Sequence, residues 1–388
     1  MKQYTNVLAI IRTAIWDEPF AGTVEEADFA EMQRQAVLTL IGPCLSRYHM
    51  PQYLYEKWRL SCIQQVSGYT RYRYFQDQLP ISVPYVVLKG TSAGQYYPYP
   101  EYRTMGDIDI MTKREDFDIA YNELLANGFK IVKSLNRETS FTKSGFVIEL
   151  HSFFASLNDT KKAKYLDDMI IENINDSHSL PDLVNGLTIL EHISQHLEHG
   201  LGLRQVIDWM MFAYRYLSDD KWNSFKKLAD DIGLVKLALV LTKMCEEYLG
   251  LPSLKWCEGS KVKMSLCEQL MDYILSNGNF GGKRNDDSAI SENVLVSTRN
   301  PISIIKLLQQ RGLINWDAAK RHRFLQRFAW LYQAGRYISK GLQRENAIIK
   351  VHNEYKEALR KKKMFDELGV IQASKGFIIY RDGEYKKK

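Results

Sequence analysis

Two aspartates separated by one residue, Asp107 and Asp109, have the types and spacing that most clearly permit chemistry. They lie in the run Gly106-Asp107-Ile108-Asp109-Ile110, and the alternation of polar and β-branched residues predicts a strand. Because residues i and i+2 of a strand point to the same face, both carboxylates should project together. Like charges this close are unfavourable unless a cation lies between them, and Mg²⁺ binds carboxylate oxygens together with substrate phosphates. The pair therefore predicts a divalent metal site, although Asp-x-Asp also occurs where an aspartate closes a turn or caps a helix.

A third carboxylate, Glu149, lies in the run Phe-Val-Ile-Glu-Leu-His at residues 146–151, which predicts another apolar strand. Glu149 occupies a position where a buried strand normally carries an apolar residue, and burying an unpaired charge is costly. If this strand lies beside the aspartates, Glu149 completes a metal cradle and His151 shares its face. The alternative is a half-exposed edge strand with Glu149 in water.

A third apolar run, residues 85–88, predicts a buried strand that ends in a turn carrying Gly90, Thr91 and Ser92. Glycine lets the backbone approach a ligand closely, and free N–H groups at a helix start favour a phosphate. The two hydroxyls would add donors. The alternative is an ordinary turn between a strand and a helix.

Two cations accompany these motifs, Lys89 at the end of that strand and Arg103 four residues before Asp107. Either can pair with a carboxylate or bind a triphosphate, Arg through a planar fork and Lys as a point charge. Arg103 is the favoured candidate because only a short loop separates it from the aspartates. The alternative for each is a surface cation.

In this order the motifs resemble the polymerase-β-type nucleotidyltransferase superfamily and are similar to a bacterial family of uncharacterised nucleotidyltransferases. The resemblance is strongest over residues 84–155 and continues to about residue 215. One departure is that Thr-Ser follows Gly90 and a longer loop rich in tyrosine and proline precedes the aspartates. The motifs that carry the resemblance are Leu88-Lys89-Gly90, Tyr97-Pro98, Tyr99-Pro100, Arg103, Gly106-Asp107-Ile108-Asp109 and Glu149-Leu150-His151.

The resemblance implies a two-metal mechanism with Mg²⁺ or Mn²⁺ as cofactor and a nucleoside triphosphate (NTP) as substrate. Asp107 and Asp109 would hold the ion that organises the triphosphate. The same pair with Glu149 would hold the ion that activates the acceptor hydroxyl, and Glu149 could also act as general base. The implied nucleotide-binding residues are Lys89, Gly90, Thr91, Ser92, Arg103 and Gly106.

The implied activity is transfer of a nucleoside monophosphate (NMP) group from an NTP to a hydroxyl acceptor, with release of pyrophosphate. The alternative is a catalytically inactive module of the same fold that binds a nucleotide or a partner. Retention of all three carboxylates with Lys89 and Arg103 favours the enzyme.

Three histidines, His192, His196 and His199, lie at helical spacing in a predicted helix over residues 188–199. They resemble a metal site, but no Cys or carboxylate completes a zinc spacing, so a structural or substrate-facing role is favoured. The similar family often carries a His-x-x-x-His helix followed by Leu-Arg and Asp. His192, His196, Arg204 and Asp208 match that pattern and are expected to line the cleft opposite the metal site.

The elements that must position these residues indicate an α+β fold with a small mixed sheet embedded in helical regions. The helical spacing of Phe29, Met32, Ala36 and Leu40 predicts a helix that breaks at Gly42-Pro43. Residues 115–127 predict a helix ended by Gly128, and residues 129–132 and 139–142 predict short strands. The expected parts are an N-terminal helical region (1–76), a nucleotidyltransferase core (77–157), a helical domain (158–275), a loop or linker (276–300) and a C-terminal helical region with a basic tail (301–388).

Composition indicates a folded protein with 388 residues, of which 45% are hydrophobic, and this suits two or three packed units. No stretch approaches 18 apolar residues, so no membrane span is expected. The five cysteines are scattered without a Cys-x-x-Cys pair, which argues against a disulfide framework or a zinc ribbon. Reduced thiols and a cytoplasmic location are therefore expected.

The net charge of +6 arises from the C-terminal tail, because residues 340–388 contain 13 Lys and Arg against 7 Asp and Glu. Such a tail can contact nucleic acid or an anionic surface, or it can be a solvated helix end where cations suit the helix dipole. The remaining chain is neutral, whereas binding to a phosphate backbone usually needs a clustered basic groove. A small molecule or a protein is therefore favoured over long nucleic acid as the acceptor.

Overall fold

A five-stranded mixed sheet carries the strands that the sequence predicted to be functional. In the sheet order β1-β2-β5-β4-β3, only β2 and β5 pair in parallel. The computed structural model describes residues 4–134, 137–157, 159–279 and 347–370, together with 305, 308–309, 312–313, 315–316, 318–319, 322 and 324–342. The strands are β1 (Tyr85–Leu88), β2 (Ile108–Thr112), β3 (Lys130–Ser134), β4 (Glu138–Lys143) and β5 (Phe146–His151).

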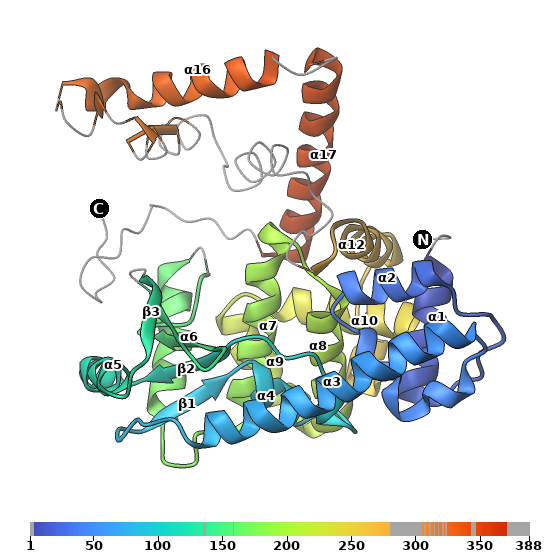
Figure 1. Cartoon of the computed structure of the whole chain (residues 1–388). Helices are drawn as coiled ribbons and strands as arrows, with labels where there is room; N and C mark the ends of the chain where they lie inside the picture. The colour runs from blue at the N-terminus through green and yellow to red at the C-terminus, as the bar shows by residue number, and fades with distance from the viewer. Residues whose placement is uncertain are drawn as a thin grey trace. The chain divides into compact units, whose positions relative to one another are not determined.

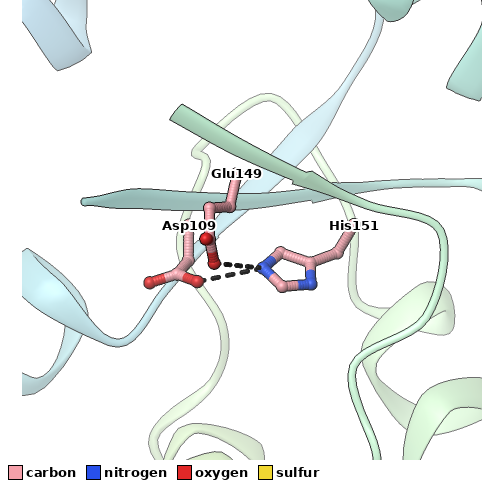
Figure 2. Close-up of side chains that lie close together, drawn as sticks. All are labelled: Asp109, Glu149 and His151. Atoms are coloured by element: carbon pink, nitrogen blue, oxygen red, sulfur yellow. Dashed lines mark hydrogen bonds and ion pairs between the residues drawn. The ribbon is translucent and has the colours of Figure 1, made fainter. Parts of the chain in front are cut away.

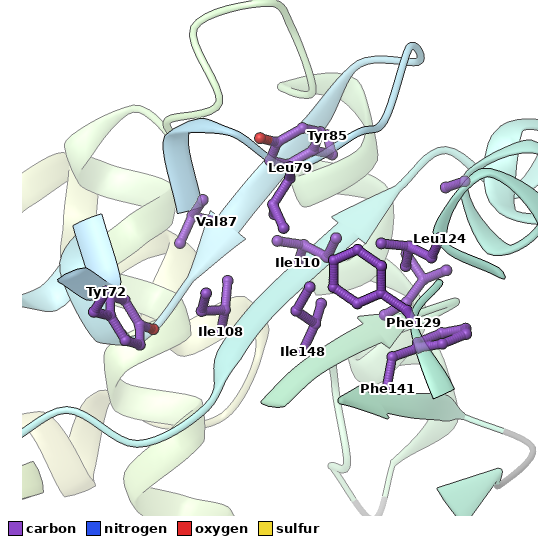
Figure 3. Packing of buried hydrophobic residues seen from close by; sticks show 12 residues of the cluster. Tyr72, Leu79, Tyr85, Val87, Ile108, Ile110, Leu124, Phe129, Phe141 and Ile148 are labelled. Carbon is purple, nitrogen blue, oxygen red and sulfur yellow. The ribbon is translucent and has the colours of Figure 1, made fainter. Parts of the chain in front are cut away.

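The sheet buries one face in an apolar core. Ile108 and Ile110 of β2 lie beside Ile148 of β5 on that face, and they pack with Leu124 and Phe129 (Figure 3). Because side chains alternate across a strand, residues 109, 149 and 151 must lie on the opposite face. The apolar residues of β2 and β5 thereby dictate which way the carboxylates point.

The helix that covers this core, α5 (Phe117–Ala126), ends as the sequence predicted. Gly128 has φ 79°, a conformation that favours glycine, and its N–H donates to the carbonyl of Leu125. The next N–H, of Phe129, donates to the carbonyl of Leu124. The chain thus reverses from α5 into β3 with its last carbonyls satisfied.

Helices make up most of the rest of the first of two units into which the chain divides, Met1–Gly282 with Leu368–Lys388. In Figure 1, α7 and α8 lie between the sheet on one side and α1 and α2 on the other. The helices of this unit are α1 (Thr5–Trp16), α2 (Glu26–Arg34), η2 (Leu38–Arg47), α3 (Gln52–Asp77), α4 (Gly90–Gly94), η3 (Pro100–Tyr102), η4 (Arg114–Asp116), α5, α6 (Thr160–Glu172), α7 (Asp182–His199), α8 (Leu203–Tyr216), α9 (Asp219–Asp231), α10 (Val235–Leu249), α11 (Lys255–Glu258) and α12 (Met264–Asn277).

The helix predicted from Phe29 through Leu40 is wrong at its end. The observed α2 stops at Arg34, because Ala36 adopts a left-handed backbone with φ 56°. The expected break at Gly42-Pro43 corresponds to a kink within the 3₁₀ helix η2, where the next residue, Cys44, has the non-helical backbone angles φ −124° and ψ 19°. The helical spacing of apolar residues did not reveal the left-handed turn at Ala36, because Ala36 itself fits that spacing.

Helices α7 and α8 pack closely beside the sheet, and a glycine permits the contact. A Cβ on Gly186 of α7 would lie 2.1 Å from Cζ of Phe212 of α8. Without that side chain the two helices approach, and α8 presents Arg204 and Asp208 toward the loop that precedes β2. The helix predicted at residues 188–199 is present as α7, but it begins six residues earlier, at Asp182.

The second unit is Lys283–Glu367, and its described helices are η6 (Leu325–Phe328), α16 (Ala329–Leu342) and most of α17 (Ala347–Leu368). Of the linker predicted from residue 276, Ser276 and Asn277 instead belong to α12, and residues 280–300 lie outside the described part. The predicted α+β fold with helical flanks is confirmed.

Two further expectations concern the chain as a whole. No helix of the described part is both long and apolar enough to cross a membrane. All five cysteines are buried free thiols, in agreement with the absence of a disulfide framework.

Candidate active site

Asp109 and Glu149 meet because their strands are parallel neighbours in the sheet. Asp109 of β2 is the register partner of Glu149 of β5, so both carboxylates lie side by side on the face opposite the apolar core. His151 lies two residues farther along β5 on the same face and turns its ring toward them (Figure 2). In the described part of the chain these three residues form the one set whose donor atoms lie within 4.8 Å of one another.

His151 lies beside both carboxylates. Its Nε2 lies 2.9 Å from Oδ1 of Asp109 and 3.8 Å from Oε2 of Glu149. Its Nδ1 lies 3.5 Å from Oε2 of Glu138, on β4. The sequence placed His151 on this face but gave Glu138 no role, because only the β4–β5 register sets Glu138 opposite His151.

Lys89 supplies the positive charge. Its Nζ lies 2.8 Å from Oδ1 of Asp109, and its side chain is 15% exposed. The backbone of Lys89 has φ 53° and that of Gly90 has φ 38°, so the chain turns sharply where β1 ends. A Cβ on Gly90 would lie 2.9 Å from the hydroxyl oxygen of Tyr72, which shows how closely α3 approaches this turn.

The charges of this pair stabilise each other. Burial alone would raise the pKa of Asp109, but the charge of Lys89 and the hydrogen bond with His151 lower it below the usual range. Burial also disfavours the ammonium of Lys89, yet Asp109 holds its pKa above the ordinary value. Both groups are therefore charged at neutral pH.

The other two carboxylates experience an excess of negative charge. Burial and the charges of Asp109 and Asp107 raise the pKa of Glu149 to about 8. The pKa of Asp107 is raised by partial desolvation among the surrounding protein atoms and by the charge of Asp109. A cation placed among these groups would relieve the repulsion.

Asp107 was predicted to lie in the strand, but the observed strand β2 begins at the next residue, Ile108. The backbone carbonyl of Asp107 accepts a hydrogen bond from the hydroxyl of Tyr72 at 2.6 Å. Its side chain is exposed and does not belong to the close set, which contains His151 in its place. The structure therefore brings together two of the three predicted metal ligands.

Arg103 is engaged away from the carboxylates of the sheet. Its Nε and Nη2 donate to the two carboxylate oxygens of Asp208 at 2.7 and 2.6 Å, and the hydroxyl of Tyr97 also donates to Asp208. Both side chains of the ion pair are less than 5% exposed. Sequence reasoning left open whether Arg103 binds phosphate or a carboxylate, and in the structure it binds a carboxylate.

The predicted hydroxyl donors are likewise engaged within the protein. The hydroxyl of Thr91 donates to Gln76, and that of Ser92 donates to Asn185, each at 2.8 Å. Gly106 is exposed, and a Cβ there would meet no atom within 4 Å. Nucleotide binding by Thr91, Ser92 and Gly106 therefore stays a prediction.

Helices α7 and α8 carry further basic groups near Lys89 and Asp107. Burial and the charges of His196 and Lys89 hold the pKa of His192 well below its usual value, so His192 is neutral. Arg204 donates to the carbonyl of Thr104 at 3.3 Å, and burial together with the charge of Arg103 lowers its pKa. The side chain of His199 lies outside the described part of the chain.

The arrangement has the donors of a divalent metal site. Asp109 and Glu149 offer oxygen ligands and His151 offers a nitrogen, and Lys89 and Arg204 supply charge suited to a phosphate on the same side. Such a constellation can bind a metal-complexed anion and accept a proton.

Comparison with known proteins agrees with this geometry. A family model described as uncharacterised nucleotidyltransferase matches residues 29–250, which include the whole sheet and helices α7 to α10. Searches of curated proteins and of solved structures found no match. Because the matched segment covers more than half of the 388 residues, the chain belongs to this family of uncharacterised nucleotidyltransferases.

Proposed function

We propose that this protein transfers an NMP group from an NTP to a hydroxyl acceptor and releases pyrophosphate. The observation that carries the proposal is the pairing of Asp109 with Glu149 on parallel strands, with Lys89 beside them, in a chain of a nucleotidyltransferase family. The raised pKa of Glu149 supports it, because the repulsion among these carboxylates favours a bound cation.

The donor set suits a divalent cation, Mg²⁺ or Mn²⁺, held by Asp109 and Glu149 with Asp107 at the edge of the site. When bound, such an ion stabilises charge on the phosphoryl oxygens and on the attacking and leaving oxygens. The remaining steps depend on the side chains of the protein.

Glu149 takes the proton of the acceptor. The acceptor oxygen attacks the α-phosphorus, its proton passes to the carboxylate of Glu149, and the bond from the α-phosphorus to the bridging oxygen breaks. Pyrophosphate leaves with the electron pair of that bond. The charges of Asp109 and Asp107 raise the pKa of Glu149, and a bound cation would relieve this repulsion and favour the ionised carboxylate that accepts the proton.

Lys89 and Arg204 bind the triphosphate in this proposal. Lys89 already lies at the carboxylates, and Arg204 lies on α8 close enough to Asp107 for its charge to oppose part of the rise in the pKa of Asp107. Arg103 acts indirectly, because its guanidinium is bound by Asp208 and holds the loop before β2 against α8. His192 and His196 lie on α7, and His192 is near enough to Lys89 for the lysine charge to lower its pKa. The acceptor is a small molecule or a protein hydroxyl, since the catalytic part of the chain carries no basic excess.

The test is label transfer. Purified protein with Mg²⁺ or Mn²⁺, a cell extract and NTPs labelled at the α-phosphate should label an acceptor and release unlabelled pyrophosphate. Asp109→Asn should lower the rate by about a hundredfold or more, because the cation that stabilises charge on the reacting phosphate would lose a charged ligand. Asp168→Asn is the matched control, since Asp168 pairs with Lys164 on α6 outside the cluster and its loss should leave the rate unchanged.

Two outcomes would contradict the proposal. Label that transfers only from the γ-phosphate would indicate a kinase. Tight NTP binding by calorimetry without transfer from either position would indicate an inactive nucleotide-binding module.

A further inference from the structure

The carboxylate cluster contains a nitrogen donor that a site made only of carboxylates would lack. His151 has a side chain only 1% exposed, and its Nε2 points at Asp109 and Glu149 (Figure 2). Burial of an imidazole ring between two carboxylates is unfavourable unless a cation or a proton joins them. We therefore expect either a proton or a metal cation between Nε2 and the two carboxylates.

The other ring nitrogen of His151 faces a carboxylate of its own. Nδ1 lies 3.5 Å from Oε2 of Glu138, which is 8% exposed and is also paired with Arg137. Histidines that bind metals usually donate this second N–H to a carboxylate, which directs the lone pair of the first nitrogen at the metal. Glu138 lies on this side of the ring, within ion-pair distance of Nδ1 although no hydrogen bond joins the two groups.

The spacing of the donor atoms fits one ion. Bonds of about 2.1 Å place adjacent ligands of an octahedral ion about 3 Å apart and opposite ligands about 4.2 Å apart. The distances from Nε2 are 2.9 Å to Asp109 and 3.8 Å to Glu149. Lys89 contacts the same Oδ1 of Asp109, but a carboxylate oxygen has two lone pairs and can serve the ion and the ammonium together.

We propose that His151 is a metal ligand through Nε2, with Asp109 and Glu149, and that the site selects a first-row transition-metal dication over Mg²⁺. Mg²⁺ takes oxygen ligands, whereas imidazole nitrogen is a ligand of the transition metals. This inference rests on the proposed function in one respect, the assignment of Asp109 and Glu149 as metal ligands. Glu138 is a positioning residue that acts through His151.

Electron paramagnetic resonance of Mn²⁺ bound to the full chain tests the proposal directly. Protein labelled with ¹⁵N-histidine should show hyperfine coupling of the bound Mn²⁺ to ¹⁵N, and unlabelled protein should show coupling to ¹⁴N. The measurement is made with and without a non-hydrolysable NTP analogue. Mn²⁺ that couples to no histidine nitrogen in either condition, or that does not bind in either, overturns the proposal and indicates that a shared proton joins His151 to the carboxylates.

Affinity measurements on variants give a second readout. His151→Gln should lower the ratio of Mn²⁺ to Mg²⁺ affinity by about tenfold or more, in the range that changes around metal-bound histidines cause. His49→Gln changes an exposed histidine outside the cluster and should leave the ratio unaltered. Glu138→Gln should weaken Mn²⁺ binding while the nitrogen coupling persists, because the ligand itself remains. An unchanged ratio in a folded His151→Gln protein would contradict the inference.

These results are separable from a failure of the proposed activity. Nitrogen coupling without any nucleotidyl transfer would keep the metal site and refute the enzyme. Nucleotidyl transfer by a protein whose metal binds only oxygen would keep the enzyme and refute His151 as a ligand.

Discussion

The buried ion pair between Arg103 and Asp208 provides a quantitative test of how α8 is joined to the loop that precedes β2. Asp208 accepts three hydrogen bonds, two from Arg103 and one from Tyr97, at 2.6 to 2.7 Å. Asp208→Asn keeps the size of the side chain but replaces one acceptor oxygen by an NH₂ group. At least one N–H of Arg103 then faces a donor, and its charge stays buried without a counter-charge.

The expected loss in the free energy of unfolding is about 3–5 kcal/mol, the cost of removing one member of a buried ion pair. Asp182→Asn is the control, because Asp182 accepts one hydrogen bond from Tyr96, at 2.7 Å, and no buried cation depends on it. Its expected cost is about 1 kcal/mol, that of an ordinary hydrogen bond. Urea unfolding followed by circular dichroism measures both values by linear extrapolation.

A double-mutant cycle separates the ion pair from side effects of each substitution. Arg103→Met, Asp208→Leu and the double variant should show a coupling free energy of about 2 kcal/mol or more, since removing both charges leaves neither one unpaired. The reasoning is refuted if Asp208→Asn costs no more than the Asp182→Asn control, or if the two single changes simply add.

Three further predictions concern the carboxylate cluster. Since burial and neighbouring charges raise the pKa of Glu149 to about 8, from 4.5, its contribution to stability is present below about pH 5 and is lost as the pH rises to about 8. In chelator, urea unfolding should therefore show Glu149→Gln gaining stability relative to wild type over this range, and a constant difference would contradict the assignment. Lys89→Met leaves Asp109 without its counter-charge, so Mn²⁺ should raise the thermal midpoint of the variant more than that of wild type; equal shifts would disprove this. Gly90→Ala should cost about 1–3 kcal/mol in urea unfolding, because φ is 38° and a Cβ would lie 2.9 Å from a tyrosine hydroxyl. The unobstructed Gly106→Ala should stay within about 0.5 kcal/mol, and equal costs would argue against strain at Gly90.

Local patterns in the sequence were sufficient to predict the strands and the direction of their side chains. The alternation of apolar and charged residues at 108–110 and 148–151 places Asp109, Glu149 and His151 on one face, because the side-chain period of a strand is two. The end of α5 at Gly128 followed from the conformational freedom of glycine, which is also a local property. The α+β fold with a mixed sheet followed from the order of these elements along the chain.

Only the tertiary structure decided which charges meet. The parallel register of β2 and β5 sets Asp109 beside Glu149, and the antiparallel register of β4 sets Glu138 behind His151. The bidentate pairing of Arg103, 105 residues distant in sequence from its acceptor on α8, has no local signature. Strand register and helix packing depend on the burial of apolar surface across the whole unit, and they bring together side chains that spacing along the sequence cannot relate.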